Sequence, residues 1–320
     1  MKYLALNLVG ALLFVVFLIG CTGKSISTSL PECRSLYADS IETPPVLLSV
    51  TSLFTLGDDT LGVCQSKDDT LFSFWKLPEC TFLFRAGVKG QGPNDFLELD
   101  RTFKGRAGGF QTFEIQTGKV KDVTFGKGGG LTIESKKLEL GEMVNRFIFL
   151  KDETYCFFLL MGETEFGLYS EKEGLRHVGQ YPNLIVKKEG EVNALVYNKL
   201  TVAHPKGDKF AAFYAYLKMC RIYASDGTLL KEKYLDGPVE LETGMRKAYY
   251  STQPFATDKH IYVLSKEPEG NVLEVWSWDA EMTDRYLLDK EFDKFIVRQG
   301  KLYGINREVE SLIYTFDLGN

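Results

Sequence analysis

From residue 46 onward the chain alternates short runs of apolar, β-branched and aromatic residues with clusters of Gly, Asp, Asn and Ser. The runs at 52–56, 61–65 and 71–77 have the length and composition of β-strands. The segments between them, Gly57-Asp58-Asp59-Thr60 and Lys67-Asp68-Asp69-Thr70, are typical hairpin corners, because Asp and Thr side chains hydrogen-bond the local backbone there. The pattern therefore predicts antiparallel β-sheet.

The strand pattern recurs along the chain. Sets of four strands end near Phe84, Ile133, Val178, Tyr234 and Leu287, and a partial set covers 295–318. The most easily recognised strand of each set lies at 72–75, 111–115, 167–170, 220–224, 273–279 and 313–317. These strands follow one another at roughly 40 to 55 residues, the repeat length of propeller blades with four strands. The sequence therefore predicts an all-β protein, a six-bladed β-propeller with four-stranded blades.

Two further segments complete the predicted fold. The last strand set is one strand short, and the N-terminal run 46–50 belongs to no set. Pairing this N-terminal strand with the C-terminal blade would close the ring and cover an open sheet edge. The segment 239–250 has helical spacing, because Leu241, Met245 and Tyr249 recur every four residues. Together with Ala248 they make this segment, inside a long connection between blades, the best candidate for a helix in a chain without a convincing helix of more than two turns.

Residues 1–20 form an apolar segment with a single charge, Lys2, and they end in Leu18-Ile19-Gly20 before Cys21. A basic start, an apolar run and small residues before a cleavage point are typical of a secretory signal peptide. Leu-Ile-Gly-Cys resembles the lipobox of bacterial lipoproteins, in which the cysteine is diacylated, becomes the new N-terminus and is then N-acylated, palmitate being a typical chain. Two alternatives stay open: an uncleaved membrane anchor, since the run is just long enough to span a bilayer, and ordinary cleavage beside an incidental cysteine.

With lipidation at Cys21, the chain divides into three parts. Residues 1–20 are the signal peptide, 21–45 are polar and read as a flexible spacer behind the lipidated cysteine, and 46–320 form the propeller. Two or more acyl chains hold a protein durably on a bilayer, so the membrane is an expected partner.

The composition limits partners and chemistry. The chain of 320 residues has a net charge of −5 and no cluster of Lys and Arg, so nucleic acid is not an expected partner. Besides Cys21 it has Cys33, Cys64, Cys80, Cys156 and Cys220, none in a Cys-x-x-Cys pair. Outside the cytoplasm an odd number allows two disulfides at most and leaves one thiol over. Cys156 lies in an apolar run and is expected to be a small buried hydrophobe.

At Gly90-Gln91-Gly92-Pro93-Asn94-Asp95-Phe96 the chain resembles the Gly-x-Gly-Pro-Gly-Glu-Phe signature of the six-bladed, TolB-like β-propeller lipoproteins of Bacteroidetes. Asn94 and Asp95 replace the Gly and Glu of the family, and both suit a turn. The resemblance takes in the lipobox, the six strand sets and this signature, so it covers nearly the whole chain. It implies fold and location. Members of the family mostly have no assigned activity, so it implies little about function.

The sequence contains no complete catalytic motif. It has neither a Gly-x-Ser-x-Gly elbow nor a His-Glu-x-x-His pair, and His177, His204 and His260 lie in three different strand sets. No cofactor and no metal site are therefore expected. The leading hypothesis is a non-catalytic binding or scaffold propeller that engages an envelope protein or glycan. The alternative is a hydrolase or lyase that holds a cation in the central channel with Asp or Glu side chains from several blades.

Three connections between predicted blades are long: 90–101, 179–198 and 235–257. In a propeller, the links from the outermost strand of one blade to the innermost strand of the next all emerge on one face. They would form a rim around one mouth of the channel, where loops vary without disturbing the blades. Because exposed Arg and Tyr dominate binding energetics, the candidate partner-binding residues on this rim are Asn94, Asp95, Arg101, Tyr181, Arg246, Tyr249 and Tyr250. For Tyr249, packing onto the core is an equal alternative.

Three short motifs bear on modification and location. Asp39-Ser40-Ile41, Asp59-Thr60-Leu61 and Asp69-Thr70-Leu71 each resemble the Asp-Ser/Thr-apolar acceptor of periplasmic O-glycosylation in Bacteroidetes. Ser40, Thr60 and Thr70 are thus candidate glycan acceptors where they are exposed, although turn geometry alone explains the last two. No acidic cluster follows Cys21, which favours the periplasmic face of the outer membrane over the cell surface.

Overall fold

The structure, a computed structural model, describes residues 30–44, 46–126, 130–141, 144–159, 162–235, 241–242 and 245–319. The predicted signal peptide and the predicted lipidation site Cys21 lie outside these residues. Residues 32–320 form one compact unit, which contains every strand found in the described residues. No helix in the described ranges is long and apolar enough to cross a membrane.

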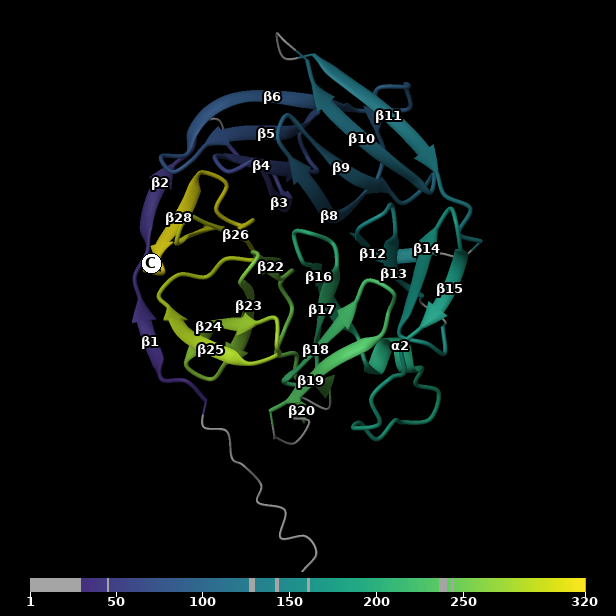
Figure 1. Ribbon diagram of the computed structural model, residues 1–320. Helices are drawn as coiled ribbons and strands as arrows, with labels where there is room; N and C mark the ends of the chain where they lie inside the picture. The colour runs from purple at the N-terminus through teal and green to yellow at the C-terminus, as the bar shows by residue number, and fades with distance from the viewer. Residues whose placement is uncertain are drawn as a thin grey trace, which may run out of the picture. The chain divides into compact units, whose positions relative to one another are not determined.

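The second unit is a six-bladed β-propeller, which confirms the predicted fold (Figure 1). Blade 1 consists of β3 (Val50–Leu56), β4 (Thr60–Gln65), β5 (Thr70–Lys76) and β6 (Thr81–Lys89), to which β7 (Asp95–Phe96) adds in parallel. Blade 2 consists of β8 (Leu99–Arg106), β9 (Gly109–Glu114), β10 (Lys119–Phe125) and β11 (Leu131–Lys137). Blade 3 consists of β12 (Val144–Phe149), β13 (Tyr155–Leu159), β14 (Phe166–Ser170) and β15 (Gly174–Val178).

The remaining blades follow the same antiparallel order. Blade 4 consists of β16 (Lys199–Ala203), β17 (Lys209–Tyr214), β18 (Met219–Ala224) and β19 (Leu229–Tyr234). Blade 5 consists of β22 (Phe255–Ala256), β23 (His260–Glu267), β24 (Gly270–Ser277) and β25 (Met282–Leu288). Blade 6 contributes β26 (Lys294–Arg298), β27 (Lys301–Ile305) and β28 (Leu312–Asp317) from the C-terminal end of the chain.

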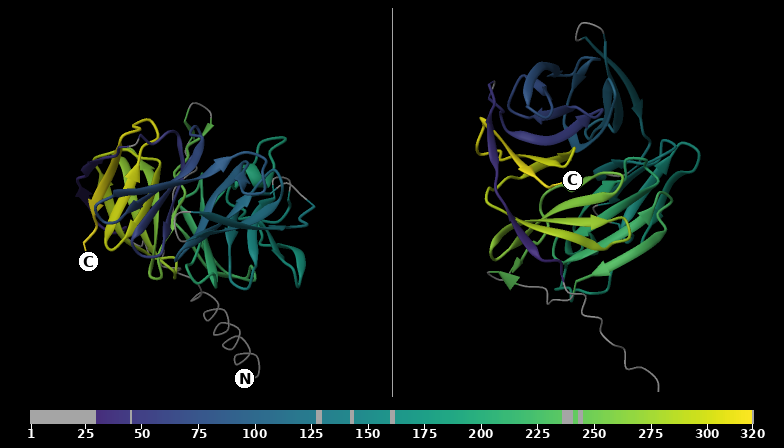
Figure 2. Two further views of the ribbon diagram at one scale, coloured as in Figure 1. Left: turned by 90° about the horizontal axis from the view of Figure 1, so that it is seen from above. Right: turned by 60° about the vertical axis from the view of Figure 1, so that its left-hand side comes forward.

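An N-terminal strand closes the ring on blade 6, as predicted, but it is not the run 46–50. The closing strand is β2 (Asp39–Glu42), antiparallel to β28, and β1 (Cys33–Leu36) pairs in parallel with β25 of blade 5 just before it. Figures 1 and 2 show this purple segment along the outer edge of both blades. Val50 instead starts the innermost strand of blade 1.

The predicted flexible spacer 21–45 therefore includes two strands of the propeller. They were missed because an outermost strand has one solvent face: in β2 only Ile41 is half-buried against the core, and the other residues are exposed and polar. Such a strand lacks the apolar run by which the other strands are recognised.

The predicted helix at 239–250 is wrong where the structure describes that segment. Leu241–Glu242 (β20) and Met245–Arg246 (β21) form a small antiparallel hairpin. Helical spacing placed Met245 inward, but it is exposed, whereas Tyr249 and Tyr250 are buried side by side. The one helix in the described residues is α2 (Asn193–Val196), a single turn in the link between blades 3 and 4.

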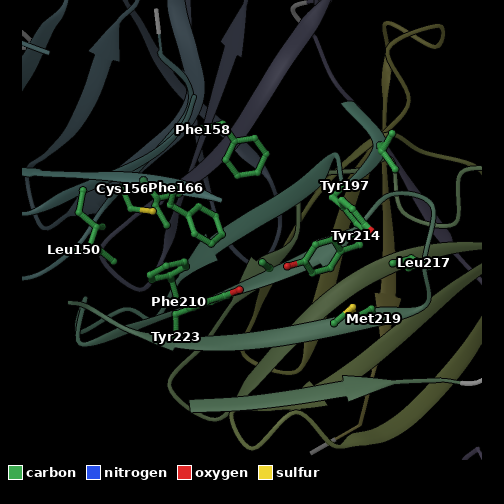
Figure 3. Close-up of a cluster of buried hydrophobic side chains, with 14 of the residues drawn as sticks. Leu150, Cys156, Phe158, Phe166, Tyr197, Phe210, Tyr214, Leu217, Met219 and Tyr223 are labelled. Atoms are coloured by element: carbon green, nitrogen blue, oxygen red, sulfur yellow. The ribbon is translucent and has the colours of Figure 1, made fainter. Parts of the chain in front are cut away.

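The core consists of layers between neighbouring blades. Among the described residues, six clusters of buried side chains form, one at each junction between two blades. Figure 3 shows the cluster between blades 3 and 4, built on aromatic side chains such as Phe166, Phe210 and Tyr214. Strands in the middle of a blade are covered on both faces, and this explains why all five residues of β13 are buried.

The five described cysteines are all free thiols. Cys64, Cys80, Cys156 and Cys220 are buried, whereas Cys33 is exposed on β1. The prediction that Cys156 is a buried small hydrophobe is confirmed, because it packs in the cluster between blades 3 and 4.

Candidate functional site

The central channel offers the main hollow of the propeller for a ligand. The innermost strands β3, β8, β12, β16, β22 and β26 surround it (Figure 1). A cavity of about 660 Å³ opens where these strands end, and a second of about 350 Å³ opens where they begin. Leu53, Arg101, Thr102 and Gln253 line both cavities, so the two meet inside the ring.

The second cavity, which we call the link-side mouth, is lined by residues of all six blades. Its wall is mostly polar and includes Glu98, Arg101, Asn145, Arg146 and Gln253. The links between blades emerge at this mouth, since each runs into the start of an inner strand. Of the candidate residues predicted on these links, Arg101 is the one that lines the mouth, where it is exposed.

Arg101 and Arg146 both sit on irregular stretches of inner strands. The pairing of β8 with β9 shifts register between Leu99 and Phe103, and that of β12 with β13 shifts between Asn145 and Ile148. Such bulges re-aim side chains and are frequent beside binding sites. Arg146 has a left-handed backbone with φ 53°, and its N–H donates to Oδ1 of Asn145 at 2.8 Å.

One buried carboxyl group lies next to the two arginines. Oδ1 of Asp100 accepts the N–H of Thr102 at 3.0 Å, and its Oδ2 accepts the N–H of Phe147 at 3.3 Å. Burial raises the pKa of Asp100 despite these bonds and the nearby charge of Arg146. Burial, and then the charge of Arg101, lower the pKa of Arg146.

The histidines do not assemble a site. His177 lies on the outer strand β15, while His204 and His260 line the wider cavity. Nδ1 of His204 lies 2.8 Å from Oδ1 of Asp208 and accepts the N–H of Lys206, and its ring lies against Trp278. The described residues contain no group of three or more His, Cys, Asp or Glu that could hold a metal ion.

The rest of the predicted rim is structural where the structure describes its side chains. Tyr250 is 1% exposed and donates to Oε2 of Glu274 at 2.9 Å, and Tyr249 is buried in the same cluster. The predicted exposure of Tyr250 is thus wrong, because blade packing covers it, and for Tyr249 the alternative of packing onto the core is confirmed. Arg246 binds Glu191 through Nη1 at 2.5 Å and Nη2 at 2.7 Å, so it joins two links to each other.

The glycine-rich signature is also a packing device. Oδ2 of Asp95 accepts the N–H of Gly92 at 2.8 Å. A Cβ added at position 90 would lie 2.3 Å from this oxygen, and one added at position 92 would lie 2.7 Å from it. Only glycine leaves room for the carboxylate at both positions. Phe96 is fully buried against Phe72, with ring centroids 5.1 Å apart. Asn94 is exposed at the turn itself.

Sequence analysis missed a buried charge cluster between blades 3 and 4. The carboxylate of Glu165 accepts hydrogen bonds from the hydroxyl groups of Tyr214 and Tyr223. It also accepts one from Nη1 of Arg221 at 2.9 Å, and it lies 3.4 Å from Nζ of Lys199. Figure 3 shows both tyrosines among the apolar side chains of this junction.

Aromatic rings surround the lysine of this cluster. Nζ of Lys199 lies 4.7 to 5.5 Å from the ring centroids of Phe158, Phe166, Tyr181 and Tyr214. Tyr181, predicted to bind a partner, is thus a half-buried cover of Lys199. A single lysine beginning an apolar strand gives little sign of such surroundings, because its neighbours come from other strands.

The candidate glycan acceptors differ in exposure. Ser40 is exposed on the outermost strand β2, where it stands opposite Tyr314. Thr60 and Thr70 are half-buried at the first positions of β4 and β5, and Oγ1 of Thr60 donates to Asp59. Ser40 thus offers the most accessible hydroxyl group of the three.

Comparisons with known proteins find solved structures of similar fold. No protein-family model and no curated protein matches the chain. A member of the DUF4221 family from Bacteroides vulgatus ATCC 8482 superposes with a TM-score of 0.60 at 11% identity, covering 90% of this chain and 97% of that one. A protein of Bacteroides fragilis NCTC 9343 described as exported gives 0.56 at 11% identity, over 89% and 96%. A streptogramin B lyase gives 0.53 at 10% identity, over 88% and 97%.

At these identities the likeness concerns the propeller fold. The two Bacteroides proteins and the lyase carry different descriptions on similar rings of blades. A fold of this kind hosts many functions, so the function has to be argued from the residues of the channel.

Proposed function

We propose that this protein is a lipid-anchored binding propeller of the cell envelope, without catalytic activity, which takes its ligand at the link-side mouth. The observation that carries the proposal is the convergence of residues from all six blades and their links, most of them polar, on one open channel. Concave sites with a few convergent polar groups are where proteins usually bind ligands. An envelope protein with an inserted segment or an envelope glycan would suit this opening.

The binding proposal is tested by blocking the channel. Thr102 lines both cavities, and of its contacts with Asp100 the backbone N–H bond is retained by any residue, while that of the hydroxyl group is lost on substitution. Thr102→Trp should abolish capture of envelope glycans on an array and of cross-linked envelope proteins. Thr132→Trp, on the exposed side of β11, is the matched control and should bind like wild type. Equal capture by both variants would show that the channel is not the binding site.

The location proposal has separate support. Leu18-Ile19-Gly20-Cys21 resembles a lipobox, and the signature at 90–96 resembles that of TolB-like propeller lipoproteins. We therefore place the protein on the periplasmic face of the outer membrane, held by lipid on Cys21. Cys21→Ala should release the protein from membranes or leave the precursor uncleaved. A mature-sized variant that still fractionates with membranes would contradict the anchor.

The alternative remains a hydrolase or lyase with a cation in the channel. It makes a different prediction, because a bound ion stabilises the folded state by mass action. A rise in melting temperature with calcium that a chelator reverses would support the enzyme. An unchanged melting temperature would support the binding function.

A further inference from the structure

Two arginines at the link-side mouth lack the partners that other arginines of this protein have. The chain has eleven arginines, all within the described residues. Eight of them form an ion pair with a carboxylate. A ninth, Arg298, donates to Oγ1 of Thr55 and the carbonyl of Gly57. Only Arg101 and Arg146 have guanidinium groups with no hydrogen bond or ion pair to another described residue.

These two side chains belong to adjacent inner strands and line the same cavity. Inner strands β8 and β12 lie next to each other, and each arginine stands at a bulge of its strand. The Arg146 guanidinium carbon lies over the ring of Phe158, 5.8 Å from its centroid, while Arg101 is exposed and lines the channel. Asp100, the adjacent carboxyl, is committed to two backbone N–H groups.

Two like charges held side by side repel each other, and a partly buried guanidinium loses hydration as well. Burial first, and then the charge of Arg101, lower the pKa of Arg146, while the nearby Asp100 raises it. An anion between the two groups would relieve both costs, since planar guanidinium groups bind oxyanions through paired hydrogen bonds. Neutral side chains at the same mouth, including Asn145, Ser251 and Thr252, could complete its coordination.

We propose that Arg101 and Arg146 together bind an oxyanion, that is a carboxylate, sulfate or phosphate group, on a ligand small enough to enter the link-side mouth. This inference rests on the proposed binding function and specifies the chemistry of its ligand. It specifies the charged group of the ligand. Among envelope glycans, one that carries an acidic sugar residue would fit the two arginines.

The test uses the full-length protein in non-ionic detergent, at constant ionic strength set with chloride. Calorimetric titrations with sulfate, phosphate and glucuronate identify which oxyanion binds, and glucose serves as the uncharged comparison. Arg101→Gln and Arg146→Gln should each lower the affinity for the anion about tenfold or more, as expected for loss of a charge-assisted contact. Arg106→Gln is the matched control, because Arg106 lies on the same strand but is paired with Asp122 outside this mouth. Its affinity should equal that of wild type.

Two results would overturn the inference: no oxyanion binds the wild-type protein, or both Gln variants bind as tightly as wild type. If Arg146→Gln fails to fold, Arg101→Gln still decides, because Arg101 is exposed and its side chain has no structural bond. Failure of this inference is distinguishable from failure of the binding function. If Thr102→Trp loses capture of the partner while the two Gln variants keep it, the binding function stands and the proposal of an anionic ligand is wrong.

Discussion

Nζ of Lys199 lies 3.4 Å from Oε1 of Glu165, and both side chains are at most 2% exposed between blades 3 and 4. Arg221 shares the same carboxylate and also pairs with Glu232 at 2.6 Å, so Glu165 is the anion that the two buried cations have in common. A buried charge is tolerated only when it is paired and hydrogen-bonded. The junction between these blades therefore depends on Glu165.

Removing that carboxylate should destabilise the protein strongly. Glu165→Gln leaves Lys199 buried without an anion and Arg221 with Glu232 alone, and we expect a loss of about 3 to 5 kcal/mol in the free energy of unfolding. Lys199→Met should cost less, because Glu165 retains Arg221 and two tyrosine hydroxyl groups. Urea unfolding measures both. Asp59→Asn, which breaks an exposed pair with Lys76, is the control and should leave the free energy of unfolding nearly unchanged. An equal loss in Glu165→Gln and Asp59→Asn would refute this account.

The buried lysine should make stability depend on pH. Burial lowers the pKa of Lys199 to about 8 from 10.5, so between these values the unfolded chain binds more protons than the folded one. The contribution of Lys199 to stability should therefore rise as pH increases from 7 to 9. Urea unfolding at pH 7, 8 and 9 should show the advantage of wild type over Lys199→Met growing with pH. Staying below pH 9.5 avoids unfolded tyrosines, which titrate near pH 10. A constant difference would show that Lys199 does not titrate in this range.

Tyr250 should matter for folding more than Arg246 does. Tyr250→Phe removes one of two side-chain donors to the buried carboxyl of Glu274, the other being Nε1 of Trp276 at 3.0 Å. We expect a loss of about 1 to 3 kcal/mol. Arg246→Ala breaks a pair with Glu191 that solvent screens, and it should lower the stability clearly less. Calorimetric melting of both variants tests this order, and the reverse order would contradict the assigned roles.

The glycines of the signature should be coupled to Asp95. Gly90→Ala would push Oδ2 of Asp95 out of its bond with Gly92 and should cost about 1 to 3 kcal/mol. In an Asp95→Ala background the same change should cost clearly less, because the clashing atom is gone. Gly130→Ala is the control, since no atom lies within 4 Å of its added Cβ. Additive losses in the double variant would exclude the proposed contact.

Hydrophobic patterning determined the number of blades and most strands, because each blade buries its middle strands between two neighbours and so repeats an apolar run. Patterning did not find β1 and β2, whose exposed outer faces leave them polar, nor the hairpin of β20 and β21, which is followed by two tyrosines, Tyr249 and Tyr250, that pack through tertiary contacts. It also predicted that Arg101 lies near the channel, but not that Arg146 faces the same cavity.

What only the tertiary structure decided is which side chains meet. Glu165 and Lys199 stand on different blades, as do Arg101 and Arg146, and nothing in local spacing indicates either pair. The hydrophobic period and the composition of a strand indicate whether each residue faces a core or solvent, because this depends on that strand alone. Which partner it finds there depends on how one sheet is rotated and bulged against the next, and that is set only when the ring of blades closes.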